Sequence, residues 1–183
     1  MKNVIKAMAV LLFAVMPVFA SAQNGGFFRP TSVISEVELD NGAKHLMVFN
    51  MPEEGQNHYY VCVGTLGLGD DYIQVNIDPV SNLFLPLGDT LAEAQAKLEE
   101  IKGIAKQPVG TTFETPGCLS IGYPNGAEME QISITHMRPL LTHLIEFSIR
   151  RNGYVRATHI AAGDFGSLIP GVKLYRKLHP KVQ

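Results

Sequence analysis

His136 and His143 are the two residues whose type and spacing point most directly to chemistry. They stand on either side of Pro139-Leu140, and a two-residue hairpin loop at that dipeptide would place the histidines directly opposite each other. Facing imidazoles can provide two ligands to zinc or copper, because a neutral ring nitrogen binds both metals. The local pattern lacks a third ligand. The alternative interpretation is that the two side chains cap the edge of an apolar sheet face.

The same predicted strands align Ser133, Glu146 and His159, which are the residue types of a hydrolytic triad. A triad needs histidine between the nucleophile and the carboxylate, so that one ring nitrogen takes the proton while the other is held. Here the carboxylate would stand in the middle, and no turn beside Ser133 could form an oxyanion hole. We interpret this row as the solvated face of a sheet.

Other motif candidates fail on spacing. Residues 64–69 do not match a dinucleotide fingerprint, and Asp70, Asp71 and Asp78 do not follow a calcium-binding loop. The sequence therefore predicts no cofactor.

Cys62 and Cys118 are the only cysteines of the chain. Export to an oxidising compartment, which the N-terminus predicts, would favour a disulfide between them. The alternative is two separate buried thiols, because free cysteine packs as a small hydrophobic residue.

Residues 1–22 have the three parts of a cleavable signal peptide. Lys2 and Lys6 precede an apolar run over residues 7–20, and Ala20-Ser21-Ala22 provides the small residues that signal peptidase needs. The apolar run has roughly 14 residues, whereas a membrane span needs about 20. We expect a protein that is periplasmic or secreted, with residues 23–183 forming a single exported domain without a membrane span.

The composition limits the partners of that domain. Loss of Lys2 and Lys6 with the signal lowers the formal charge from −2 to −4, and the remaining charges are not clustered in the sequence. This mildly acidic balance gives no electrostatic reason to expect binding to nucleic acid or to anionic lipid.

The best specified element is a helix over residues 90–106. Thr90 and Glu93 form a capping box, which supplies hydrogen-bond partners to the first turn. Apolar residues then recur at helical spacing, and Pro108 ends the helix. We expect the apolar stripe to pack on a sheet.

Strands account for most of the rest. Asn41-Gly42 and Asn152-Gly153 each predict a tight hairpin turn between two apolar-rich runs. Further strands are expected over residues 59–65, 72–77, 83–85, 111–115 and 130–138, and a short helical segment over 164–168, interrupted at Pro170-Gly171. The sequence therefore predicts an α+β fold in which antiparallel β-meanders, forming a sheet that can be curved or barrel-like, pack against one amphipathic helix and a short C-terminal helical segment follows.

These strong fold signals come without a catalytic motif. We therefore expect a non-catalytic binding or interaction module whose partner is a small molecule or a protein. One alternative is an envelope hydrolase whose site is assembled from distant residues, because catalytic groups converge in space rather than in sequence. Another is a metal-binding protein that uses His136 and His143.

Overall fold

The structure is a computed structural model of the chain, and it describes residues 30, 32–39, 44–65, 67–68, 82–120, 123–151 and 153–180. The expected signal peptide, the Asn41-Gly42 turn and the expected strand over 72–77 lie outside the described residues.

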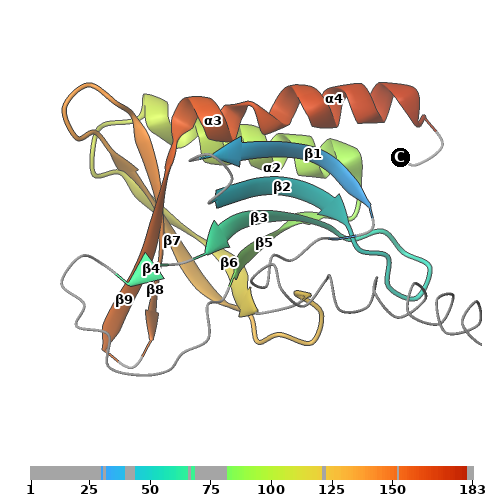
Figure 1. Ribbon diagram of the computed structural model, residues 1–183, viewed down its shortest axis with the longest axis horizontal. Helices are drawn as coiled ribbons and strands as arrows, with labels where there is room; N and C mark the ends of the chain where they lie inside the picture. The colour runs from blue at the N-terminus through green and yellow to red at the C-terminus, as the bar shows by residue number, and fades with distance from the viewer. Residues whose placement is uncertain are drawn as a thin grey trace, which may run out of the picture.

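One antiparallel sheet dominates the fold (Figure 1). Its strand order is β1-β2-β3-β5-β6-β7-β8-β9-β4. The bounds are β1 Val33–Leu39, β2 Lys44–Asn50, β3 Tyr59–Thr65, β4 Gly67–Leu68, β5 Asn82–Gly88, β6 Thr112–Ser120, β7 Glu130–Met137, β8 Leu144–Arg151 and β9 Tyr154–Ala161. The sheet and its helices confirm the predicted α+β class.

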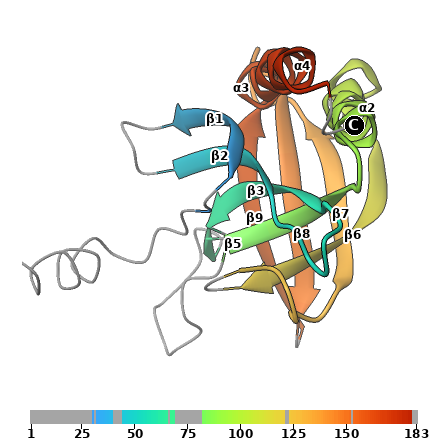
Figure 2. The ribbon, with the colours of Figure 1, turned by 90° about the vertical axis from the view of Figure 1, so that its right-hand side faces the viewer.

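The sheet curls strongly but stays open. The two-residue strand β4 follows β3 almost directly in the chain and pairs with β9 through Gly67–Ala157 and Leu68–Arg156. The last long strand thereby returns toward β3 (Figure 2). Strands β1 and β2 continue the sheet outward from β3, so the sheet does not close into a barrel.

Helix α2 (Leu91–Gly103) begins at the predicted capping box, in which Glu93 N donates to Thr90 Oγ1 and Thr90 N donates to Glu93 Oε2. Its buried residues are Leu91, Ala94, Leu98 and Ile101, which form the predicted stripe. Burial of each leucine contributes about 1.5–3 kcal/mol. A short 3-10 helix, η2 (Ile104–Lys106), extends α2 toward Pro108.

The C-terminal helical segment is longer than the sequence suggested. Helix α3 (Ala162–Gly166) is followed by α4 (Leu168–Leu178), which continues through Pro170. Proline is tolerated there because the first-turn N–H groups of a helix have no intrahelical partner. Helices α2 and α4 lie side by side and pack on the sheet (Figures 1 and 2).

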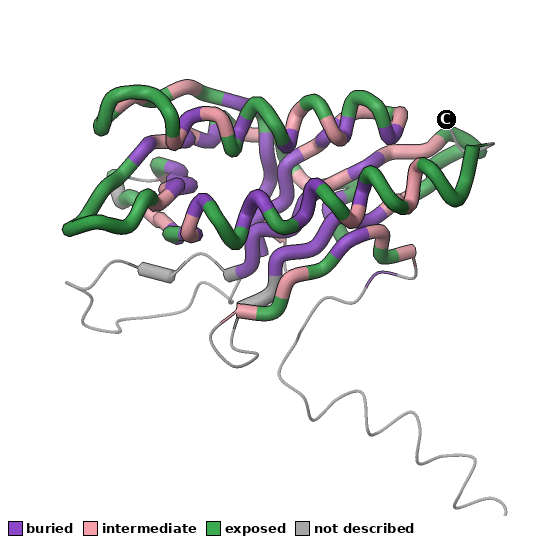
Figure 3. Tube along the Cα trace, turned by 90° about the horizontal axis from the view of Figure 1, so that it is seen from above, coloured by how far each residue is buried: buried purple, intermediate pink, exposed green. Residues whose placement is uncertain are grey.

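Buried residues recur along one side of each long helix (Figure 3). They meet the inward side chains of the curved sheet in one main core. Its members include Leu46, Val61, Leu85, Ile134, Phe147, Leu98 and Val172. A smaller cluster lies on the opposite sheet face and consists of Met47, Phe49, Cys62, Phe84 and Cys118.

Of the two hairpin registers predicted for the second half of the chain, one was confirmed and one was wrong. In the β8–β9 hairpin, Ile145 pairs with Ile160 as predicted. In the β7–β8 hairpin the pairing is shifted by two residues, so that His136 faces Ile145 and Ile134 faces Phe147. The prediction of a two-residue loop at Pro139-Leu140 was wrong, because the strands end at Met137 and restart at Leu144. A shift of two preserves the alternation of faces, so the predicted apolar face is still the buried one.

Candidate functional site

The His136 and His143 rings are in contact, although by a different register from the predicted one. Their Nε2 and Nδ1 atoms are 2.8 Å apart, and the rings stack with centroids 5.0 Å apart. His136 Nδ1 lies 2.8 Å from the carbonyl oxygen of Gln107. A carbonyl only accepts, so His136 donates from Nδ1, and its Nε2 lone pair accepts the Nδ1 proton of His143.

This histidine pair offers two nitrogens to a metal, but zinc requires at least one more protein ligand. Among the residues that the structure describes, no group of three or more His, Cys, Asp or Glu side chains could hold a metal ion. The lone pair of His136 that a metal would need is already used in the hydrogen bond to His143.

No disulfide joins Cys62 and Cys118. Both cysteines are free and buried, which agrees with the alternative of two separate thiols. Phe84 pairs with Cys62 on one side and with Cys118 on the other, so a whole strand separates the two cysteines. Two strand spacings amount to about 9.5 Å, whereas bridged Cα atoms lie within about 7 Å. Burial raises the pKa of Cys62 to about 12 and that of Cys118 to about 11, so neither is a reactive thiolate at neutral pH.

The row of triad residue types does not form. Because of the register shift, Ser133 pairs with Ser148, while Glu146 stands between Thr135 and His159. Glu146 and His159 make a cross-strand pair of 2.9 Å on the outer face. This arrangement agrees with the interpretation of the row as a polar sheet face.

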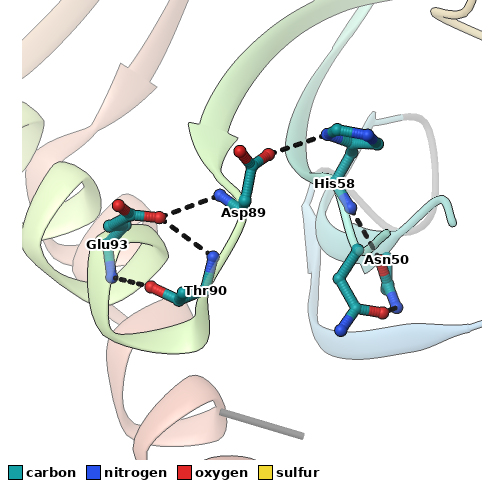
Figure 4. A network of polar contacts seen from close by, with 6 residues as sticks. Asn50, His58, Asp89, Thr90 and Glu93 are labelled. Carbon is teal, nitrogen blue, oxygen red and sulfur yellow. Dashed lines mark hydrogen bonds and ion pairs between the residues drawn. The ribbon is translucent and has the colours of Figure 1, made fainter. Parts of the chain in front are cut away.

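A histidine–carboxylate pair that sequence reasoning missed lies at the N-terminus of α2 (Figure 4). His58 Nδ1 is 2.7 Å from Asp89 Oδ1, and Asp89 N donates to Glu93 Oε2 at 2.9 Å. Gly88, with φ of 112°, makes the turn that places Asp89, and a Cβ atom there would lie 2.7 Å from the Cβ of Glu93. The signal in the sequence that could have indicated this pair is Gly88-Asp89, directly before the capping box.

The His58 pair has the electronic arrangement of a general base. An aspartate at Nδ1 leaves the Nε2 lone pair of the ring free to accept a proton. The side chain is partly exposed, so water can reach it. In the described part of the chain, the only hydrogen-bond partner of its ring is Asp89. Among the residues that the structure describes, no nucleophilic side chain is hydrogen-bonded to this base.

A cleft of about 390 Å³ lies between α2 and α4. Its lining residues are Glu99, Lys102, Gly103, Lys106, Gly166, Ile169, Pro170 and Lys173. Three of these are lysines and one is a carboxylate, so the cleft is cationic. Glu99 Oε1 pairs with Lys173 Nζ at 3.0 Å, and this interaction lowers the pKa of Glu99.

Gly166 leaves room for the side chain of Lys102, one of the three lysines. A Cβ atom on Gly166 would lie 2.6 Å from Cε and 2.7 Å from Nζ of Lys102. The Lys102 side chain therefore lies against the backbone of α3, although the residue is exposed. This contact holds its ammonium group beside the cleft.

A second cleft of about 420 Å³ lies beside the end of β2, and Phe49, Met51, Pro52 and Tyr123 contribute to its lining. One of its walls is Pro30, whose chain neighbours lie outside the described residues. Its full lining is therefore not defined, and no ligand class follows from it.

No family model, no curated protein and no solved structure matches this chain. Of the helices that the structure describes, none has the length and apolar character to cross a membrane.

Proposed function

We propose that this protein is an exported, non-catalytic binding module that holds a small carboxylate- or phosphate-bearing ligand between α2 and α4. The observation that carries this proposal is the convergence of Lys102, Lys106 and Lys173 on one cleft. These lysines come from three separate helical segments, α2, η2 and α4.

The size and charge of the cleft suit such a ligand. Ligand sites usually have volumes of about 300–1,000 Å³, and the cleft falls within that range. Each ammonium group offers three donors, and a hydrogen bond to a charged group contributes about 1.5–3 kcal/mol. Repulsion among the three lysines is relieved when an anion binds. The chain as a whole is slightly acidic, so this cationic cleft stands out from its surroundings.

Glu99 has a defined part in this proposal. Its carboxylate pairs with Lys173 and so competes with an incoming anion for the same ammonium group. A ligand must displace Glu99 or bind beside it, which favours ligands of more than one negative charge. Replacement of Glu99 by glutamine removes the competitor and should tighten binding.

Isothermal titration calorimetry with pyrophosphate and citrate, at low ionic strength and neutral pH, tests the proposal. Lys102→Gln and Lys173→Gln should each weaken binding by about tenfold, equivalent to about 1.4 kcal/mol. Lys177→Gln is the matched control, because Lys177 is an exposed lysine of α4 that does not line the cleft. The absence of binding, or an equal effect of all three variants, would refute the proposal.

The His58–Asp89 pair favours a second candidate function, an envelope hydrolase. Since none of the described nucleophilic side chains is bonded to it, His58 would act as a base on a water molecule. Hydrolysis of activated esters and glycosides should then be lost in His58→Ala and retained in His179→Ala. Hydrolysis that persists in His58→Ala would exclude this candidate.

A further inference from the structure

The loop between β7 and β8 exposes two adjacent leucines almost completely. Leu140 is 95% exposed and Leu141 is 83% exposed. Val109 and Met137 are also exposed, and a hydrogen bond from Gly110 N to His136 O joins their two segments. We call these four residues the leucine tip. The loop extends beyond the helices at the upper left of Figure 1.

The backbone at Leu140 makes this exposure more notable. Its φ of 57° lies in the left-handed region, which glycine and asparagine adopt far more easily than leucine. Leucine is therefore unfavourable here both for its backbone conformation and for its contact with water. No core packing compensates, because the side chain is exposed. An outlier of this kind is a reason to look for a function.

Two cationic residues, Arg138 and Lys106, belong to the segments that carry the leucine tip. Arg138 belongs to the loop itself and is exposed. Lys106 is also exposed, and it directly precedes Gln107, whose carbonyl accepts from His136. Asp164 of α3 is an acidic residue at the same end of the described chain, since α3 begins at Ala162, whose N–H donates to His143 O. Apolar side chains flanked by cations match the acyl boundary and headgroups of an anionic bilayer.

We propose that the leucine tip inserts into the headgroup region of an anionic lipid bilayer and docks the protein on that surface. Leu140 and Leu141 would enter the acyl boundary, while Arg138 and Lys106 would contact lipid phosphates. Long basic side chains can do so because their methylene stems lie along the apolar surface. The leucine tip shares Lys106 with the anion cleft, but its two leucines do not line that cleft. The net charge of the chain is an average over all residues, so it does not reveal the cationic residues beside the leucine tip.

Vesicle co-sedimentation of the full chain tests this proposal. The expected result is binding to vesicles of phosphatidylcholine with about a quarter phosphatidylglycerol, and at least tenfold weaker binding to phosphatidylcholine alone. Leu140→Ser/Leu141→Ser should lose about tenfold in affinity for the anionic vesicles. Val155→Ser/Met129→Ser is the matched control, since it removes two exposed apolar side chains elsewhere and should bind like the parent. Every variant contains the same apolar run over residues 7–20. Differences in vesicle binding between variants therefore reflect the leucine tip.

Leu140→Gly separates the proposed role from a structural one. Glycine accepts the positive φ, so this variant should keep or raise the melting temperature while vesicle binding falls. Equal binding to neutral and anionic vesicles would overturn the proposal. So would unchanged binding of the double serine variant, or a tip-dependent dimer that forms without lipid and shows no affinity for vesicles.

Discussion

His143 donates its Nδ1 proton to Nε2 of His136 across 2.8 Å, and His136 in turn donates to the carbonyl of Gln107. This chain of hydrogen bonds joins the β7–β8 loop to the end of η2, where Lys106 lines the cleft. The leucine tip and the cationic cleft are thus connected through this pair of rings, of which His136 is only 2% exposed while His143 is exposed.

A double-mutant cycle should show that the two histidines stabilise the fold as a unit. His143→Ala leaves the buried Nε2 of His136 without a donor, which should cost about 1–3 kcal/mol of unfolding free energy. The coupling energy between His136→Ala and His143→Ala should be about 1 kcal/mol, measured by urea unfolding. Strictly additive effects would mean that the hydrogen bond contributes nothing to stability.

Zinc should not raise the melting temperature through this pair. Two nitrogens are one ligand short of the three that protein zinc sites use, and a shared hydrogen bond already occupies them. Differential scanning fluorimetry with excess zinc at pH 7.5 should give the same melting curve as with a chelator. A zinc-dependent stabilisation that His136→Ala abolishes and His179→Ala keeps would show that a third ligand exists and that this interpretation is wrong.

Cys62 and Cys118 should remain reduced and unreactive in the folded protein. Burial raises the pKa of both thiols, to about 12 and about 11, and Phe84 lies between them. A chromogenic thiol reagent at pH 8 should detect no thiol in the native protein and both thiols after denaturation. Mass spectrometry of non-reduced peptides that found the two cysteines joined would contradict the strand pairing described here.

Glu93 should make the stability of α2 depend on acid pH. Hydrogen bonds from the N–H groups of Asp89 and Thr90 lower the pKa of its carboxyl group in the folded protein. Its stabilising contribution is therefore present above the ordinary glutamate pKa and is lost as the pH falls through the lowered folded value. The Glu93→Gln variant should be less stable than the parent at pH 7, and the difference should shrink toward pH 3.

Urea unfolding at several pH values measures this effect. Glu100→Gln is the control on the same helix, because Glu100 makes an exposed pair with Lys97 that is worth little. A destabilisation in Glu93→Gln that does not change with pH would assign the effect to side-chain shape instead of charge.

The elements that the sequence predicted well are those with local signals. The capping box of Thr90 and Glu93 is a contact within one helical turn, and the β8–β9 register is the one predicted from the dipeptide Asn152-Gly153. The predicted β7–β8 register was wrong because the length of the loop between these strands depends on contacts with other segments. One of these is the hydrogen bond between the carbonyl of His143 and Ala162 N.

The cleft could not be predicted from periodicity or motif. Lys102 and Lys173 lie far apart in the chain, and only the packing of α2 beside α4 brings them together. The role of Gly166 likewise depends on a tertiary contact, because Lys102 occupies the space that a Cβ atom on this residue would need. The sequence correctly placed His136 and His143 on the same face, since the two-residue error in register preserves the alternation of strand faces.

The central claim is that an anion binds between α2 and α4, and a titration followed by amide NMR tests it most directly. Addition of pyrophosphate to the isotope-labelled protein should shift the backbone resonances of Lys102, Gly103, Gly166 and Lys173 along saturable curves. The same titration of Lys102→Gln should need about tenfold more ligand to reach half-saturation. Shifts that grow without saturation, or that fall on exposed lysines outside the cleft such as Lys177, would contradict the account.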